Sequence, residues 1–303
     1  MWRHMSGQDG YVLPVFVVFM TVVIGIGAIT LDAGRMYTTK LMLRNISDAA
    51  ALAGVASLPG STSNAIATAI EYAVLNGADP DKVLVEVSSN NDKLMVAVTK
   101  TLQLNFAGLI SAGTVNISAT STAGIGVTRQ ARMAQPFGIE DAVFVIGESY
   151  VLKVSPHSSD PPPYGNFYAL ALGLPGAKTY SQNIMYGYDG WISVGDMIET
   201  EPGNMDGPTS DGVRYRINQD PGATFDKFVP SSPRVILIPI VDSFEVNGRT
   251  TVRIEGFASF FLESYNLSQD EIVGRFMRRI VPGDAAWDGG VADYGTSTVK
   301  LMR

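Results

Sequence analysis

The sequence predicts an α+β protein: a long N-terminal transmembrane and stalk helix, a small α+β head, and a mostly β C-terminal domain of the sandwich or barrel type. Three observations lead to this fold class. An uncharged run at positions 11–31 continues into a half-polar helical stretch. Helical and alternating patterns then extend to about residue 130. From residue 137 on, helical periodicity disappears, while glycine, proline and aromatic residues become frequent.

The apolar run is long enough to cross a membrane. At about 1.5 Å per residue, a helix over residues 11–31 spans roughly 31 Å, the thickness of a bilayer core. A cleaved secretory signal is the alternative, with Asp32-Ala33-Gly34 as its conceivable cleavage site. The apolar part of a signal has only about 7–15 residues, and the residues after this run read as continuing helix. We therefore predict a retained membrane helix after a cytoplasmic or leader segment at 1–10.

The charges that flank the run do not fix its orientation. Arg3 precedes the run, whereas Arg35, Lys40 and Arg44 follow it. Positive charge marks the cytoplasmic side of a membrane helix, so the two flanks argue in opposite directions. The size of the C-terminal part and the lack of a second apolar span favour its export, with the bulk of the chain outside the cytoplasmic membrane.

A stalk and a small head are predicted up to residue 130. The stalk helix ends near residue 58, and its alanine-rich end is thin enough to pack closely, either into its own head or against a neighbouring subunit. Four of its residues repeat at heptad-like spacing: Leu43, Ile46, Ala50 and Ala53. The head at 59–130 is predicted to contain a helix closed by Asn76-Gly77, strands at 83–87 and 94–98, a short helix at 102–110 and a strand at 115–127.

The remaining domain, at 134–303, reads as short strands separated by turns. Such a pattern is typical of a β sandwich or barrel. Residues 271–281 fit either a helix or an edge strand. The other strands are predicted at 142–146, 150–154, 167–172, 213–217, 235–241, 251–254 and 258–262.

Composition excludes several classes of function. The chain has no cysteine, which excludes disulfides, thiolate metal sites and a cysteine nucleophile. It has two histidines, His4 before the run and His157 in a proline-rich loop, so histidine zinc clusters are excluded as well. The net charge is −7 and no basic patch is interleaved with aromatic residues, which argues against nucleic-acid binding. We predict no catalytic residues, and the chain is expected not to be an enzyme.

Two motifs resemble the N-terminal region of TadE/TadG-like proteins of bacterial Tad (Flp) pilus systems. The first is LDAGR at residues 31–35, directly after the apolar run, and the second is LRNISDAAALAG at residues 43–54. In the family, a membrane helix leads into a Leu-Asp-x-Gly-Arg turn and then an alanine-rich stretch. Here Arg44-Asn45 replaces the usual Gln-x, and Ile46-Ser47 stands where the family often has Ala-Ala. The resemblance covers about residues 8–128.

The resemblance implies a single-span, pilin-like subunit that assists assembly of an adhesive pilus. Membrane lipid, other pilus subunits and a second copy of the chain would then be its partners. Gly7 is a candidate for prepilin-peptidase cleavage, although Val12 stands where such sites have glutamate. The part at 194–209 is similar to a segment of some TadE/TadG-like proteins to which no activity is attached.

Candidate packing residues lie along the N-terminal helix. Gly25, Gly27 and Ala28 form a small-residue patch that would let another helix approach, although glycine is also simply common in membrane helices. Asp32 and Arg35 are three residues apart, so they share a helix face at the membrane edge. They form either a specific pair that sets the depth or register of the helix against a partner, or a pair at the membrane boundary whose charged groups extend toward the water.

A glycine-rich segment holds the candidate metal ligands. Calcium binds six to eight oxygens, and acidic loops can supply them. The candidates are Asp196, Glu199, Glu201, Asp206 and Asp211, although acidic surface turns are the simpler interpretation because no EF-hand spacing is present. Aromatic residues precede this segment and belong either to a glycan-binding surface or to the core and rim of a β domain: Tyr180, Tyr186, Tyr188 and Trp191.

Three functions follow, in order of preference. The first is a structural or assembly subunit of a Tad-type pilus or related surface filament, anchored by one helix and without a cofactor unless calcium binds. The second is a surface adhesin or carbohydrate-binding module on a pilin-like stalk, for which an exposed aromatic platform would argue. The least favoured is an exported hydrolase, which would need two carboxylates about 5–10 Å apart in a cleft.

Overall fold

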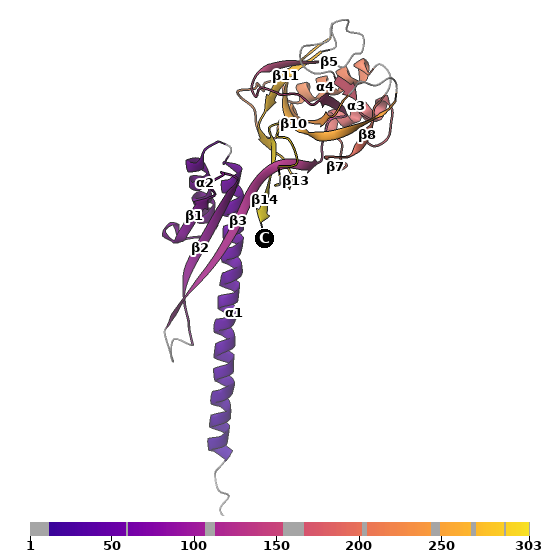
Figure 1. Cartoon of the computed structure of the whole chain (residues 1–303). Coiled ribbons are helices and arrows are strands. Elements are labelled where there is room, and N and C mark those ends of the chain that lie inside the picture. The colour runs from indigo at the N-terminus through magenta and orange to yellow at the C-terminus, as the bar shows by residue number, and fades with distance from the viewer. Residues whose placement is uncertain are drawn as a thin grey trace, which may run out of the picture. The chain divides into compact units, whose positions relative to one another are not determined.

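The computed structural model describes residues 12–58, 60–106, 113–153, 167–201, 205–243, 249–267, 271–287 and 289–302. The candidate cleavage residue Gly7 and both histidines lie outside them. The chain divides into two compact units, one with residues 1–124 and 301–303 and the other with residues 125–300. The predicted fold class is confirmed, since a long N-terminal helix is followed by a mostly β C-terminal region (Figure 1).

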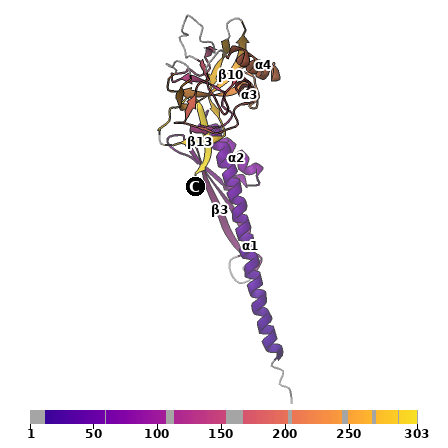
Figure 2. The same ribbon diagram turned by 90° about the vertical axis from the view of Figure 1, so that its right-hand side faces the viewer.

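The first unit is a helix–helix–sheet head built on one continuous helix. Helix α1 (Val12–Ala56) runs for 45 residues through both the apolar run and the stalk. Helix α2 (Thr62–Leu75), the short 3-10 turn η1 (Pro80–Lys82) and strands β1 (Val83–Val87), β2 (Lys93–Gln103) and β3 (Thr114–Ala131) follow. The strands pair antiparallel in the order β1-β2-β3. In both ribbon views, α2 and the strands lie along the C-terminal half of α1 (Figures 1 and 2).

Local signals place the turns of this unit. The hydroxyl of Ser61 accepts a hydrogen bond from the backbone N–H of Asn64 and caps the start of α2. Gly77, at a φ of +95°, ends the same helix in a conformation that favours glycine. Asn91 takes a φ of 53° in the turn between β1 and β2, as asparagine tolerates. These signals are local in the sequence, which is why the helix and the hairpin could be predicted.

The predicted helix at 102–110 is wrong where the structure describes it. Leu102 and Gln103 continue β2, and their partners in β3 are Val115 and Thr114. The side chain of Leu102 is buried by this pairing. The prediction failed because a short amphipathic stretch fits both the helical and the strand period. The hydrogen bonds that the long strand β3 supplies decide in favour of a strand. Residues 107–110 lie outside the described residues.

The second unit is built on a sheet of seven strands. Their order is β5-β11-β10-β9-β4-β6, with β8 on one end of the long strand β10. The neighbouring strands are antiparallel except β4 and β9, which are parallel. The bounds are β4 (Phe137–Glu140), β5 (Ser149–Lys153), β6 (Phe167–Ala169), β8 (Met197–Glu199), β9 (Val235–Val241), β10 (Thr251–Asn266) and β11 (Glu271–Met277).

Both faces of this sheet are covered. On one face, Phe260 of β10 and Phe276 of β11 form a core with Ile184 of helix α3 (Ala177–Tyr186) and Val213 of helix α4 (Asp206–Gln219). On the other face, Phe257 belongs to a second apolar cluster. Around these clusters lie the short strands β7 (Ile192–Ser193), β12 (Arg279–Ile280), β13 (Gly283–Ala286) and β14 (Thr296–Met302), of which β7 and β13 pair with the end of β3.

Several strand predictions for this unit need correction. No strand forms at 142–146, and the predicted strand at 213–217 is part of α4. Val213 and Ile217 are four residues apart, so the pattern that suggested alternation also suits one face of a helix. The predicted strands at 251–254 and 258–262 are parts of one strand, β10. A register shift between Ile254 and Gly256 lies where the two were expected to be separate, and a second shift follows Leu262. The open choice at 271–281 is settled in favour of strands β11 and β12.

Candidate functional site

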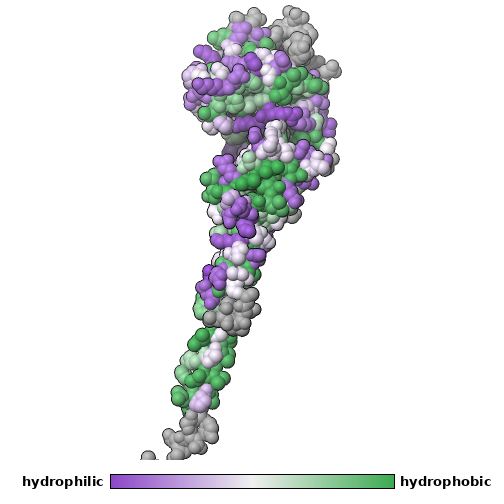
Figure 3. All heavy atoms as spheres, turned by 90° about the vertical axis from the view of Figure 1, so that its left-hand side faces the viewer, coloured by the Kyte–Doolittle hydropathy of each residue, from purple (hydrophilic) through white to green (hydrophobic). Residues whose placement is uncertain are grey.

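The exposed N-terminal half of α1 is the most unusual surface of the first unit. Residues 12–31 contain no charged side chain, and none of the side chains in this stretch is buried. Many are large and apolar, among them Phe16, Phe19 and Ile24. The space-filling view shows a mostly green surface on one side of this part of the helix (Figure 3). These 20 residues span roughly 30 Å, which matches a bilayer core.

Asp32 marks the point where α1 meets its own head. Its side chain is only 4% exposed. The two carboxylate oxygens accept hydrogen bonds from the backbone N–H groups of Asn105 and Phe106, each at 3.0 Å. Because two backbone donors at the end of β2 depend on one carboxylate, Asp32 ties the sheet to the helix directly beyond the apolar half.

Polar contacts continue along the same side of α1. A guanidinium nitrogen of Arg35 donates to the carbonyl of Gln103 at 3.2 Å, and the ammonium of Lys40 donates to the carbonyl of Ser118. Asp32 and Arg35 therefore both contact the backbone at or just beyond the end of β2 within the first unit. A register that this pair sets against a partner stays a prediction. The contacts of Arg35 and Lys40 with the sheet could not be predicted from the count of charges on the two sides of the apolar run.

The two glycines of the small-residue patch have open space beside them, whereas Ala28 is partly buried. A Cβ atom added to Gly25 or Gly27 would meet no other atom within 4 Å. At 100° per residue, Gly25 and Gly27 point to nearly opposite sides of α1, while Gly25 and Ala28 share a side. The patch is therefore two narrow surfaces, one on each side of the helix, and both are available to partners outside the chain.

The heptad-like positions of the stalk pack inward. Leu43, Ile46 and Ala50 are buried, and Ala53 is partly buried. Beside them, a Cβ atom on Gly54 would lie 2.8 Å from the Cβ atom of Ala69 in α2. The alanine-rich end of the stalk thus packs into its own head, which resolves the alternative that the sequence left open.

The five acidic candidates do not meet at one point. Among the described residues, no group of three or more acidic or histidine side chains is placed to hold a metal ion. Asp196 accepts a hydrogen bond from the backbone of Ser193 in the turn between β7 and β8. Asp206 begins α4, and Asp211 is exposed on the same helix.

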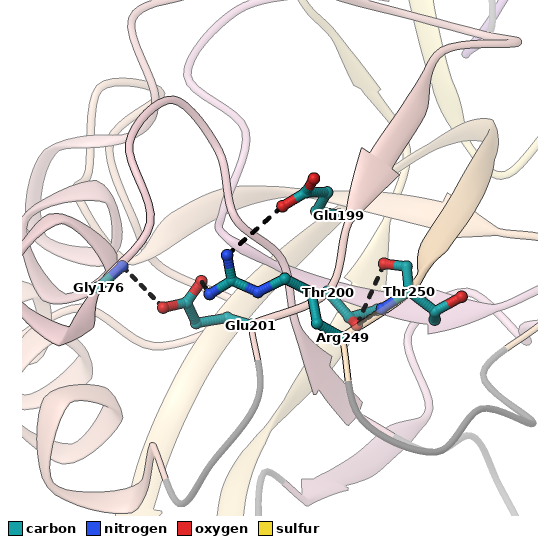
Figure 4. A network of polar contacts seen from close by, with 6 residues as sticks. All are labelled: Gly176, Glu199, Thr200, Glu201, Arg249 and Thr250. Carbon is teal, nitrogen blue, oxygen red and sulfur yellow. Dashed lines mark hydrogen bonds and ion pairs between the residues drawn. The ribbon is translucent and has the colours of Figure 1, made fainter.

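Glu199 and Glu201 share a cation instead (Figure 4). The guanidinium of Arg249 lies 3.6 Å from a carboxylate oxygen of Glu199 and 3.7 Å from one of Glu201. The other oxygen of Glu201 accepts from the backbone N–H of Gly176 at 2.7 Å. This network connects three segments of the second unit, at Gly176, at residues 199–201 and at Arg249.

The four aromatic candidates divide between core and surface. Tyr180 is buried, and burial raises the pKa of its phenol although the hydroxyl shares a hydrogen bond with Thr209. Tyr188 packs against the second apolar cluster. Tyr186 and Trp191 are more than half exposed and both line a cavity in the second unit. Three arginines of that cavity were missed, because Arg132, Arg216 and Arg279 carry no common signal in the sequence.

Comparison with known proteins identifies the N-terminal region. Residues 10–57 match the family model described as "Putative Flp pilus-assembly TadE/G-like". The matched segment contains the exposed apolar half of α1, Asp32, Arg35 and the alanine-rich packing surface. The resemblance found in the sequence is thereby confirmed for this region. No curated protein and no solved structure shows a significant match to the chain.

Proposed function

We propose that this protein is a membrane-anchored structural subunit that assists assembly of a Tad-type pilus. The observation that carries the proposal is the contrast within α1, whose matched segment joins an exposed, uncharged half to a half that forms the core of a head. In this proposal the apolar half lies in the cytoplasmic membrane or in a filament, and the bulk of the chain is extracytoplasmic. Its role is assembly rather than catalysis.

The packing of the stalk argues against a cleaved signal. Cleavage near Gly34 would remove Asp32, and the backbone N–H groups of Asn105 and Phe106 would lose their acceptor. Cleavage would also divide a helix whose C-terminal half supplies buried residues to the head. A retained anchor explains both features, since the same helix then serves the membrane on one side of Asp32 and the head on the other.

The proposal is tested with leucine substitutions at the two free helix surfaces. We expect Gly25→Leu or Gly27→Leu to reduce pilus formation, because added bulk holds neighbouring helices apart. A Cβ atom at either position has no other atom within 4 Å, so the fold and the membrane recovery of the protein should stay unchanged. Pili are counted by electron microscopy of cells that express each variant in place of the original gene.

The two variants control each other because they probe opposite sides of α1. Loss of pili with one variant and not the other would identify the side that packs against a subunit. Normal pilus numbers with both variants, together with normal numbers in cells lacking the protein, would contradict the proposed role in assembly.

A second candidate function is a surface binding module. It is favoured by the exposed rings of Tyr186 and Trp191 at the cavity of the second unit. The two functions are compatible, since an assembly subunit can present a ligand site on the part of the chain that lies beyond its anchor.

A further inference from the structure

A cavity in the second unit collects side chains from distant parts of the chain. Its volume is about 300 Å³, at the lower end of the range for small-molecule sites. Arg132 follows β3, Tyr186 ends α3, Trp191 precedes β7, Arg216 lies in α4 and Arg279 lies in β12. The floor is formed by residues of β9. A cavity of this size suits a ligand with one ring and its substituents.

The charge in the cavity is opposite to that of its unit. Residues 125–300 contain 14 lysines and arginines against 21 carboxylates, yet three arginines and no carboxylate line the cavity. The nearest pairing at the rim is the ion pair of Arg132 with Asp189, whose side chain is 85% exposed. Positive charges that gather in a concave, partly apolar site raise the local concentration of anions.

Arg216 is buried without a carboxylate partner among the described residues. Its guanidinium donates to the carbonyls of Ile184 and Pro233, and to the side-chain oxygen of Gln135 when that amide is turned toward it. Burial lowers the pKa of Arg216 to about 10, and burial also lowers the pKa of Arg279. The guanidinium of Arg279 also has a neutral acceptor, the carbonyl of Pro230 at 2.8 Å. No carboxylate among the described residues pairs with Arg216 or Arg279, and an anionic ligand would compensate their charge.

Two exposed aromatic residues and an unusual backbone conformation lie at the cavity. The ring of Trp191 is 53% exposed and that of Tyr186 is 57% exposed. Met133, which also lines the cavity, holds a φ of 64°, a conformation rare for a side-chain-bearing residue and frequent at ligand sites. Gly187 makes the close approach possible, because a Cβ atom there would lie 2.9 Å from the backbone of Met133. Tyr186 and Trp191 thus line the cationic cavity with more than half of their surface exposed.

We propose that this cavity binds an acidic saccharide, with the carboxylate of a uronic-acid residue between the arginines and the sugar ring against the exposed aromatic faces. Guanidinium groups match the planar geometry of a carboxylate. Aromatic faces suit the apolar side of a sugar ring, whereas a small inorganic anion has no apolar surface to place against them. The site would give the protein a ligand beyond its role in pilus assembly.

The test is calorimetric titration of the full-length protein in detergent micelles. The probes are trimers of galacturonate and of glucuronate, the same trimers after reduction of their carboxyl groups, and inorganic phosphate. We expect an acidic trimer to bind and the reduced trimers and phosphate to bind at least about tenfold more weakly, because hydrogen bonds to charged groups are strong. Binding should weaken as salt is added.

Substitutions assign the binding to this cavity. We expect Arg279→Gln to weaken binding of the acidic trimer about tenfold or more, and Trp191→Ala to weaken it about 2- to 12-fold. The matched control is Arg278→Gln, since the adjacent Arg278 is exposed, pairs with Asp293 and does not line the cavity. Its affinity should stay within about twofold of the original. Thermal melting confirms that each variant is folded.

Three results would overturn the inference. The first is no binding of either acidic trimer at millimolar concentration. The second is equal binding of acidic and reduced trimers or of phosphate, which would remove the acidic sugar as the specific ligand. The third is an equal loss of affinity with Arg279→Gln and Arg278→Gln, which would place the binding outside this cavity.

Discussion

The two halves of α1 form one continuous helix but differ in which residues they expose. The first half exposes apolar side chains, and the second half contains the residues that are buried in the head. Residues 12–31 are uncharged and exposed, whereas all eight buried residues of the helix lie from Asp32 onward. The buried set includes the polar residues Asp32 and Ser47 and small residues such as Gly54, beside Leu43, Ile46 and Val55. A helix that served a water-soluble core throughout would bury its most apolar half.

This contrast indicates that the two halves of α1 are suited to different surroundings. The second half is thin because α2 and β2 approach it closely, and its polar residues bind the backbone of its own head. Most of the first half offers large apolar side chains, apart from the two narrow surfaces at Gly25 and Gly27, and such a surface suits lipid or a bundle of neighbouring helices. Asp32 is the boundary at which one kind of packing gives way to the other.

The largest expected effect comes from placing charge in the exposed half. The double variant Val22→Arg/Val23→Arg should lose membrane recovery, because each arginine near the middle of a span costs about 2.5–3.5 kcal/mol of insertion free energy. Both residues are exposed in the unit, so the head should fold as before. Membrane fractionation after carbonate washing measures the result.

Leu41→Arg is the matched control for this prediction. Leu41 is exposed too, but it lies beyond Asp32 in the second half of α1. Its substitution should leave membrane recovery unchanged. Full membrane recovery of the double variant would show that the first half is held by something other than a bilayer.

The second-largest expected effect distinguishes a glycine in the second half of α1 from one in the first half. Gly54→Val should destabilise the head by about 3 kcal/mol, since its side chain would collide with Ala69, the backbone of Ala65 and Leu94. The melting temperature should fall by more than about 10 °C, if it remains measurable at all. Gly27→Val, where no atom lies within 4 Å, should melt like the original protein in detergent. Equal melting of the two variants would refute the packing described for α1 and α2.

A smaller effect is expected at the boundary itself. Asp32→Ala should cost about 1–3 kcal/mol of unfolding free energy, because two backbone N–H groups at the end of β2 lose their acceptor. Hydrogen exchange should show faster exchange of the amides of Asn105 and Phe106. Asp81→Ala, at an exposed turn, should change stability by less than about 0.5 kcal/mol. Unchanged exchange at these two amides would mean that Asp32 does not hold the sheet.

The smallest effect concerns the helix that covers the packed half. Ser61→Ala should lower the stability of the head by about 1 kcal/mol, because α2 loses the side-chain cap of its first turn. Ser61→Asp keeps an acceptor at that position and should retain most of the stability. Chemical unfolding followed by circular dichroism distinguishes the two variants, and equal losses in both would argue against capping as the cause.

Local patterns explain which elements could be predicted. Strands β1 and β9 have the bounds expected from their runs of branched apolar residues, and Ser61 and Gly77 delimit α2 as turn chemistry requires. Residues 213–217 of α4 were mistaken for a strand because the spacing of Val213 and Ile217 fits both a strand and one face of a helix. The contact that buries this part of α4 is its approach to Ile184 of α3, which Gly212 allows. Such close approaches between elements leave no periodic signal in either one.

The sequence by itself determined the apolar span, the continuity of α1 and the family of the N-terminal region, because these follow from side chains that are neighbours in the chain. Only the tertiary structure decided the partners of the functional side chains. It buried Asp32 against the end of β2, spread the acidic candidates apart, paired Glu199 and Glu201 with Arg249, and brought Arg132, Arg216 and Arg279 to one cavity. The physical reason is that charges and hydrogen bonds act over a few ångströms in space, and the fold alone sets which distant residues come that close.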